Sequence, residues 1–178
     1  MQVQFIKWLV VFIVISAMSS NAGAKQYTVS SPDEYNAIAS SLKAGDDVIL
    51  QNGVYQDFEI LLVGQGSVEK PITLTAQTKG KVILSGRSNL KLAGQYLEVS
   101  GLVFKDGYTP SSAVIAFRKD AQTPANYSRV SEVVIDEYSN PDRQESDYWV
   151  ALYGKHNRFD HNHLTGKRNK GVTVAVRL

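Results

Sequence analysis

The 178-residue sequence contains no cysteine, so it can form no disulfide, offers no thiolate metal ligand and has no lipoprotein attachment site. It also lacks a nucleophile elbow, a phosphate-binding loop and a dinucleotide-binding glycine motif. The formal net charge is only +2, which excludes a generally basic protein that coats nucleic acid. Stability must therefore come from burial and hydrogen bonding alone.

The first 24 residues have the pattern of an export signal. Lys7 precedes an apolar run at residues 8–17, and Ala22-Gly23-Ala24 provides the small-x-small sequence of a cleavage site. A transmembrane helix needs roughly 20 apolar residues, so an uncleaved anchor is the less favoured alternative. We predict a signal peptide at residues 1–24 and a mature protein in the periplasm or the extracellular medium.

One helix is expected near the start of the mature chain, over Glu34–Leu42. The segment Ser31-Pro32-Asp33-Glu34 combines an N-cap serine, a proline at the first helical position and the glutamate of a capping box. Three apolar residues then fall at i, i+3 and i+7 and form one buried stripe: Tyr35, Ile38 and Leu42. Ala44-Gly45 is expected to end the helix.

From Asp47 onward, short apolar runs alternate with Gly, Asn, Asp and Ser, which predicts an all-β chain. The expected strands are Val48–Leu50, Phe58–Leu62, Ile72–Thr75, Val82–Leu84, Leu97–Val99, Leu102–Phe104, Val114–Phe117, Val133–Ile135, Trp149–Tyr153 and residues 171–178. Such a chain could form a sandwich, a barrel or a solenoid, and the spacing of the strands has to decide.

An internal repeat favours the solenoid. Apolar residues at i, i+3 and i+5 begin at Val99 and Val130, and the pattern returns at Phe159 with Asn162 in the middle position. Repeats of about 20–50 residues indicate stacked coils, each here a strand, a bend and a strand; an antiparallel sandwich is the alternative. Asn162 should point inward and form hydrogen bonds along the stack, and the helix should cap the N-terminal end of the core. Residues 171–178 have the alternating pattern of a strand, and no capping segment follows them. We therefore expect a chain that continues beyond Leu178.

The densest polar cluster lies at residues 155–170. It contains all three histidines, which we interpret as surface residues rather than metal ligands. Several cations could line a groove for a linear polyanion, with ordinary solvated charges as the alternative: Lys155, Arg158, Lys167, Arg168, Lys170 and Arg177. The acidic segment 136–147 is interpreted as a solvated loop rather than a calcium site. Trp149 and Tyr153 are predicted to share one face and fill the core.

Trp149–Leu178, together with Ala44–Tyr55 and Lys70–Ala76, closely resembles polysaccharide lyase family 6. That family contains alginate lyases and the chondroitinase B type of dermatan sulfate lyase. The resemblance covers essentially the whole mature chain. It implies that residues 25–178 are the N-terminal part of a right-handed parallel β-helix with an N-terminal capping helix.

The resemblance also implies β-elimination on a uronic acid polymer, assisted by calcium, with a lysine base and an arginine near the leaving oxygen. These family motifs lie beyond the position of Leu178. No catalytic residue or calcium ligand is therefore assigned, and residues 1–178 alone should be inactive. At most, Lys167, Arg168 and Arg177 line the approach to the substrate.

Two classes of function remain open at this point. The first is a lyase, with alginate as the preferred substrate and dermatan sulfate as the alternative. The second is an exported β-helix that binds glycans without cleaving them. An anionic polysaccharide is the expected partner, with neither nucleic acid nor, after signal cleavage, a membrane. The oligomeric state cannot be read from the sequence.

Overall fold

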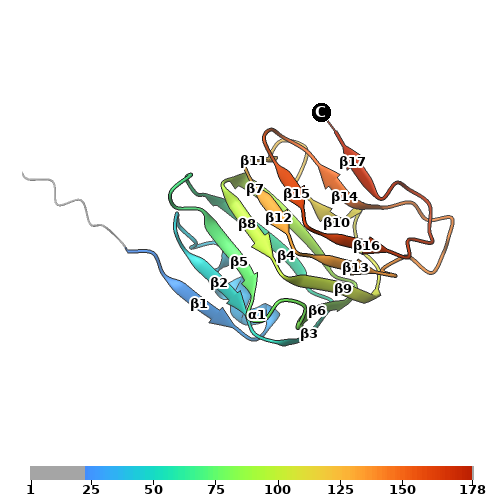
Figure 1. Cartoon of the computed structure of the whole chain (residues 1–178), viewed down its shortest axis with the longest axis horizontal. Helices are drawn as coiled ribbons and strands as arrows, with labels where there is room; N and C mark the ends of the chain where they lie inside the picture. The colour runs from blue at the N-terminus through green and yellow to red at the C-terminus, as the bar shows by residue number, and fades with distance from the viewer. Residues whose placement is uncertain (1–22, 178) are drawn as a thin grey trace, which may run out of the picture.

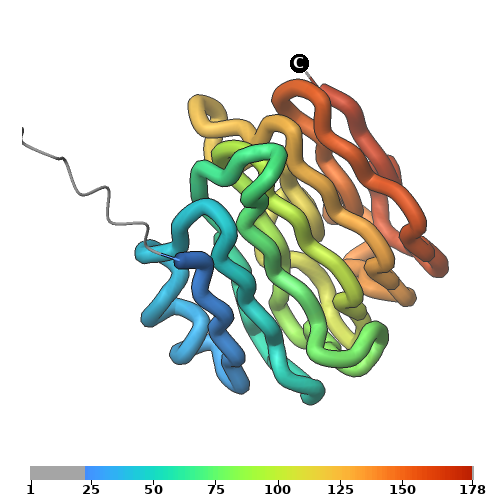
Figure 2. Tube along the Cα trace, turned by 60° about the vertical axis from the view of Figure 1, so that its left-hand side comes forward, coloured from blue at the N-terminus to red at the C-terminus, as the bar shows by residue number. Residues whose placement is uncertain are grey.

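Three parallel sheets run along the molecule and form the walls of a β-solenoid (Figure 1). The computed structural model describes residues 23–177, so the predicted signal peptide lies almost entirely outside the described residues. In each coil the chain passes through sheet A, then sheet B, then sheet C, and successive coils lie side by side along the tube in Figure 2. The predicted parallel β-helix is thus confirmed, and the antiparallel sandwich is excluded.

The strands of each sheet pair in parallel, with one shift of register between Leu84 and Gly86. Sheet A contains β1 (Gln26–Val29), β2 (Asp47–Leu50), β5 (Ile72–Ala76), β8 (Leu97–Ser100), β12 (Arg129–Ser131) and β15 (Arg158–Asp160). Sheet B contains β3 (Gly53–Gln56), β6 (Val82–Gly86), β9 (Leu102–Gly107), β13 (Val134–Asp136) and β16 (His163–Thr165). Sheet C contains β4 (Glu59–Gln65), β7 (Asn89–Gln95), β10 (Ala113–Ala116), β11 (Ala125–Asn126), β14 (Tyr148–Leu152) and β17 (Val174–Val176).

The repeat found in the sequence corresponds to the stacking of sheets A and B. Val99 pairs with Val130, and Val130 pairs with Phe159. The residues at the bends adopt positive φ, +82° at Gly101 and +58° at His161, which glycine adopts without strain. Each copy is therefore a strand, a left-handed bend and a strand, as predicted.

Asn162 points into the stack as expected. Its Oδ1 accepts a hydrogen bond from the Val133 N–H at 2.8 Å, and its Nδ2 donates to the Val130 carbonyl at 3.1 Å. The side chain therefore satisfies two backbone groups of the preceding coil at a bend where the regular ladder is interrupted.

The predicted capping helix is present as α1 (Pro32–Ala39), over the first coil (Figure 1). The Tyr35 hydroxyl donates to the Leu61 carbonyl at 3.0 Å, and its fully buried ring meets Phe58 edge-on. The helix ends earlier than predicted, because the Ser41 hydroxyl donates to the Ile38 carbonyl and competes with the helical bond. Leu42 reaches the core from the following turn instead.

The ten expected strand segments all coincide with strands, although their ends differ by a few residues. Strands β1, β3, β7 and β11 were not expected, and β12, β15 and β16 were indicated only by the internal repeat. Within residues 23–177, no helix is long and apolar enough to cross a membrane.

Candidate functional site

The structure does not bring the three predicted groove residues together. Lys167 is buried between two loops, Arg168 lies beside sheet B, and Arg177 follows β17 in sheet C. Their contact with substrate remains a prediction, and each position has to be considered separately.

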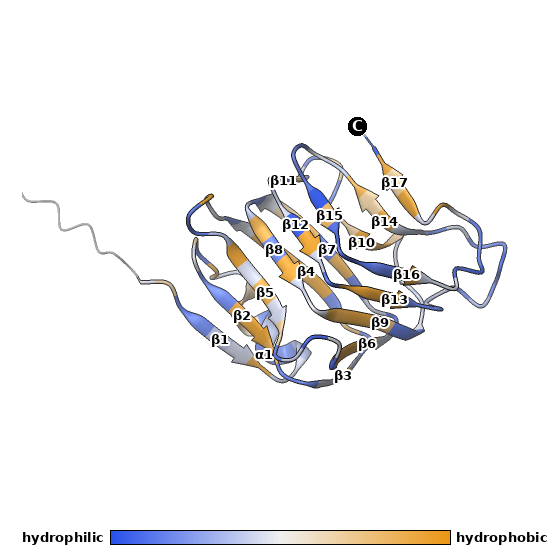
Figure 3. Ribbon diagram, viewed as in Figure 1, coloured by the Kyte–Doolittle hydropathy of each residue, from blue (hydrophilic) through white to orange (hydrophobic). Residues whose placement is uncertain are grey.

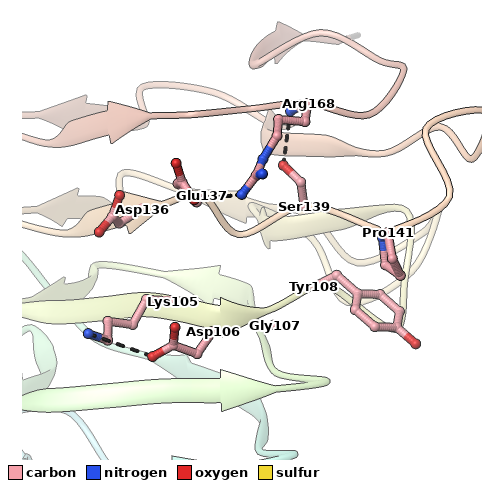
Figure 4. Close-up of a pocket in the computed structure, with 9 residues that line it drawn as sticks. All are labelled: Lys105, Asp106, Gly107, Tyr108, Asp136, Glu137, Ser139, Pro141 and Arg168. Carbon is pink, nitrogen blue, oxygen red and sulfur yellow. Dashed lines mark hydrogen bonds and ion pairs between the residues drawn. The ribbon is translucent and has the colours of Figure 1, made fainter.

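Arg168 lies in a cleft of about 390 Å³ next to the ends of β9 and β13 (Figure 4). Its guanidinium contacts the Glu137 carboxylate at 2.5 Å, and its backbone N–H donates to the Ser139 hydroxyl at 3.1 Å. The ionisable residues of the lining include three carboxylates and only two cations: Asp106, Asp136, Glu137, Lys105 and Arg168. A cleft with this balance of charge does not favour a polyanion.

Lys167 belongs to a closed polar cluster. Its ammonium donates to Asp147 Oδ1 at 2.6 Å and to Asn169 Oδ1 at 2.8 Å, 5.8 Å from the centre of the Trp149 ring. Asn169 Nδ2 in turn donates to Asp147 Oδ2 at 2.7 Å. The side chains of Lys167 and Asp147 are only 8% and 7% exposed, so this cation holds two loops together.

The outer face of sheet C carries a regular arrangement that the sequence reading missed. Ala116, Ala151 and Ala175 pair in register in three successive coils. Two residues further along each coil stand Arg118, Tyr153 and Arg177. The ladder between coils continues to Arg177, whose N–H donates to the Leu152 carbonyl. At Arg118 the chain leaves the ladder for the turn at residues 118–124, because the Phe117 carbonyl accepts from the Ala125 N–H. The repeated spacing, alanine followed two residues later by a cation or an aromatic residue, was the signal available in the sequence.

Two arginines on this face lie over tyrosine rings. The Arg118 guanidinium carbon is 3.7 Å from the centre of the Tyr153 ring. The corresponding distance from Arg177 to Tyr148 is 4.8 Å, and the Arg177 guanidinium also donates a hydrogen bond to the Tyr148 hydroxyl. Stacking on an aromatic ring fixes the plane of a guanidinium and leaves its edge N–H groups available.

On the outer face of sheet A, Asp160 is the centre of a charged network. Arg129 donates to both of its carboxylate oxygens, at 2.8 and 2.7 Å, and Arg158 and His161 also contact it. The hydrogen bonds from Arg129 are the main reason that the pKa of Asp160 lies well below its ordinary value. Arg158, another of the predicted cations, therefore shares one carboxylate with Arg129.

Several predictions for this region need correction. Trp149 is buried as expected, but Tyr153 lies outside the main core, in the small cluster with the alanines. The segment 136–147 is only partly solvated, since Tyr138 is fully buried and Asp147 nearly so. The Tyr138 hydroxyl accepts from the Ser88 N–H at 2.7 Å, which ties the segment to an earlier coil.

His156, His161 and His163 are exposed, in agreement with their interpretation as surface residues. Among residues 23–177, no three His, Asp or Glu side chains are grouped so that they could hold a metal ion. The resemblance places the calcium ligands beyond Leu178, so no chemical step through calcium is derived from these residues.

The fold and the sequence together define a class of protein. Residues 29–178 match the family model described as Chondroitinase B, which covers most of the chain. The chain therefore belongs to the chondroitinase B family. A comparison with curated protein sequences gives no significant match.

Solved structures add detail to this assignment. The alginate lyase AlyGC of polysaccharide lyase family 6 is 59% identical, with a TM-score of 0.84, over 86% of this chain and 21% of that chain. A family 6 lyase from human gut microbiota, described as specific for mannuronic acid, is 33% identical, with a TM-score of 0.77, over 85% of this chain and 36% of that one. The family 6 lyase Pedsa3628 from Pseudopedobacter saltans is also 33% identical, with a TM-score of 0.79, over 85% and 34% of the two chains.

The resemblance to family 6 lyases is thus confirmed. The chain spans only about a fifth to about a third of the length of these relatives. The activity and substrate of the whole protein are therefore proposals.

Proposed function

We propose that the protein is a polysaccharide lyase that cleaves alginate, a polymer of uronic acids, by β-elimination. The observation that carries this proposal is the 59% identity to an alginate lyase over 86% of the chain. A parallel β-helix alone would not carry it, because one fold supports many functions.

The reaction removes the C5 proton of a uronate and expels the oxygen at C4. It requires the neighbouring carboxylate to be neutralised, because the C5 proton is only weakly acidic otherwise. In the full protein, calcium would provide this neutralisation, a lysine the base and an arginine the stabilisation of the leaving oxygen. Residues 23–177 contribute the stacked coils. Of the three predicted groove residues, Arg177 is the candidate substrate contact, because Lys167 is buried and Arg168 lies in an acidic cleft.

The protein acts outside the cytoplasm, in the periplasm or the medium. The export pattern of residues 1–24 supports this location. It also agrees with the substrate, because a high-molecular-weight polysaccharide is met outside the cell. The mature protein needs neither nucleic acid nor a membrane as a partner.

Dermatan sulfate is the second candidate substrate, because the matching family model is named after chondroitinase B. The test is to incubate the full gene product with each polymer and to measure the absorbance of unsaturated uronate ends. We expect release of product from alginate and none from dermatan sulfate. Release from dermatan sulfate alone would reverse the choice, and binding without product from either would favour the non-catalytic glycan-binding protein.

A further inference from the structure

A second cleft lies on the outer face of sheet C, away from the acidic cleft at Arg168. It has a volume of about 380 Å³ and lies between the turn at residues 118–124 and the turn that follows β14. Arg118 lines one side, and Tyr153 and Lys155 line the other. The cleft thus spans two successive coils of the solenoid.

Both walls of the cleft are held in place by the backbone. The 118–124 turn is closed by the Lys119 N–H, which donates to the Thr123 carbonyl at 3.0 Å, and by Asp120 Oδ1, which accepts from the Thr123 N–H at 2.9 Å. On the other side, the Lys155 N–H donates to Asn126 Oδ1 at 2.8 Å. Gly154 has a φ of +73°, and a Cβ there would lie 2.1 Å from the Ala125 carbonyl oxygen.

The cations of the cleft have no anionic partner. Among the described residues, every ion pair of an arginine or lysine with a carboxylate involves a cation other than Arg118 and Lys155. No carboxylate oxygen lies within 4.0 Å of the charged nitrogens of these two residues. Asp120 also lines the cleft, but its carboxylate is used within its own turn. Two cations against one carboxylate leave the cleft with a net positive charge.

Arg118 has the geometry of a receptor for a planar anion. Its guanidinium carbon lies 3.7 Å from the centre of the Tyr153 ring, and this contact restrains the guanidinium before any ligand arrives. A preorganised guanidinium loses less entropy when it forms two parallel hydrogen bonds to a carboxylate. Lys155 supplies a second, more mobile positive charge.

We propose that this cleft is a distal binding subsite for the carboxylate of one uronate residue of the substrate, with Arg118 as its principal contact and Tyr153 as the residue that orients Arg118. The inference rests on the proposed function, because it takes the ligand from that substrate class. Arg118, Tyr153 and Arg177 each follow by two residues one of the paired alanines Ala116, Ala151 and Ala175, which lie in three successive coils spaced about 4.8 Å apart. A linear polyanion lying along the stack would present successive sugar residues to successive coils.

The test compares variants of the full protein on alginate polymer and on oligouronates of defined length. Arg118→Gln should raise KM for the polymer about tenfold, the loss expected for a hydrogen bond to a charged group, and leave kcat unchanged. The shortest cleavable oligomer should be unaffected, because it does not reach the cleft. Arg87→Gln is the control, since Arg87 is an exposed arginine whose guanidinium carbon lies 6.0 Å from the centre of the Tyr108 ring, away from the cleft.

Substitutions of Tyr153 test the orienting role separately. Tyr153→Phe keeps an aromatic platform and should behave as the unmodified protein, whereas Tyr153→Leu should raise KM for the polymer by several-fold. Circular dichroism of each variant monitors folding. Equal KM values for Arg118→Gln and Arg87→Gln, or equal effects on short and long substrates, would overturn the subsite.

An independent readout separates this inference from the proposed function. Equilibrium binding of a long oligouronate and of carboxyl-reduced alginate is measured without turnover. Weaker binding of the oligouronate to Arg118→Gln, and no binding of the reduced polymer to either protein, supports the subsite even if no product is released. Absence of turnover by the unmodified protein would refute only the lyase, whereas undiminished oligouronate binding by Arg118→Gln would refute only the subsite.

Discussion

Replacement of Lys167 by methionine tests the buried ion pair that joins the loops around β14 and β16. Methionine preserves most of the volume of the side chain but removes the ammonium, which donates to Asp147 at 2.6 Å. The Asp147 carboxylate, 7% exposed, would keep Asn169 as its only side-chain donor among the described residues. Removal of one partner of a buried pair costs about 3–5 kcal/mol, because an uncompensated charge remains inside the protein.

A loss of this size is a large part of the free energy of unfolding, which is typically about 5–15 kcal/mol. For a folded unit of this size, each kcal/mol shifts Tm by about 2–4 °C, so the expected decrease is about 6–20 °C. The assay is thermal unfolding followed by circular dichroism at several scan rates, because an irreversible transition depends on the rate of heating. Lys170→Met is the matched control: Lys170 is exposed, and its replacement should change the stability by less than about 0.5 kcal/mol.

The double variant Lys167→Met/Asp147→Leu distinguishes a lost charge partner from lost packing. Without a buried carboxylate, most of the cost should disappear, because apolar replacements of a buried pair are often neutral. A residual loss of about 1–3 kcal/mol is expected, because Asn169 Oδ1 loses its partner. The reasoning would be refuted if Lys167→Met were as stable as Lys170→Met, or if Lys167→Met/Asp147→Leu were less stable than Lys167→Met.

Three further predictions concern other parts of the chain. The pKa of Asp160 is lowered in the folded protein, so Asp160 contributes stability at neutral pH that is lost as the pH falls below about 4, the ordinary pKa. In Asp160→Asn the free energy of unfolding should therefore depend less on pH in this range. An unchanged dependence on pH would contradict this. Residues 25–178 expressed alone should associate through the exposed edge of β17 (Figure 3). The double variant Val172→Lys/Val174→Lys should associate less, as measured by sedimentation velocity. A monodisperse monomer of the unmodified chain would contradict this prediction. N-terminal sequencing of exported protein should begin at Lys25, whose N–H donates to Asp46 at 2.9 Å; recovery of residues 8–17 in a membrane fraction would show an anchor.

The solenoid could be predicted because the residues that form its repeat are all buried in the same core. Val99, Val130 and Phe159 all point into one continuous core and all follow the same two-strand pattern. Strand β7 was missed for the opposite reason. Its sequence includes Lys91, Ala93 and Gly94, which have low β-propensity, and the strand forms because neighbouring coils on both sides supply its hydrogen bonds.

The roles of the cations could not be predicted from the sequence, because they depend on which anion the coiling brings within reach. Lys167 and Arg168 are adjacent in the sequence, yet one meets a buried aspartate and the other a glutamate beside an open cleft. Arg118 lies outside the cluster at residues 155–170 and was overlooked, although the stacking of coils places Tyr153 directly beside it. In a solenoid, charge clusters therefore have to be sought at equal positions of successive coils, about 25–35 residues apart here, rather than along the chain. Applied to sheet C, this rule selects Arg118, Tyr153 and Arg177 as one group, and Arg118→Glu or Arg177→Glu should weaken the binding of a ligand that spans the group.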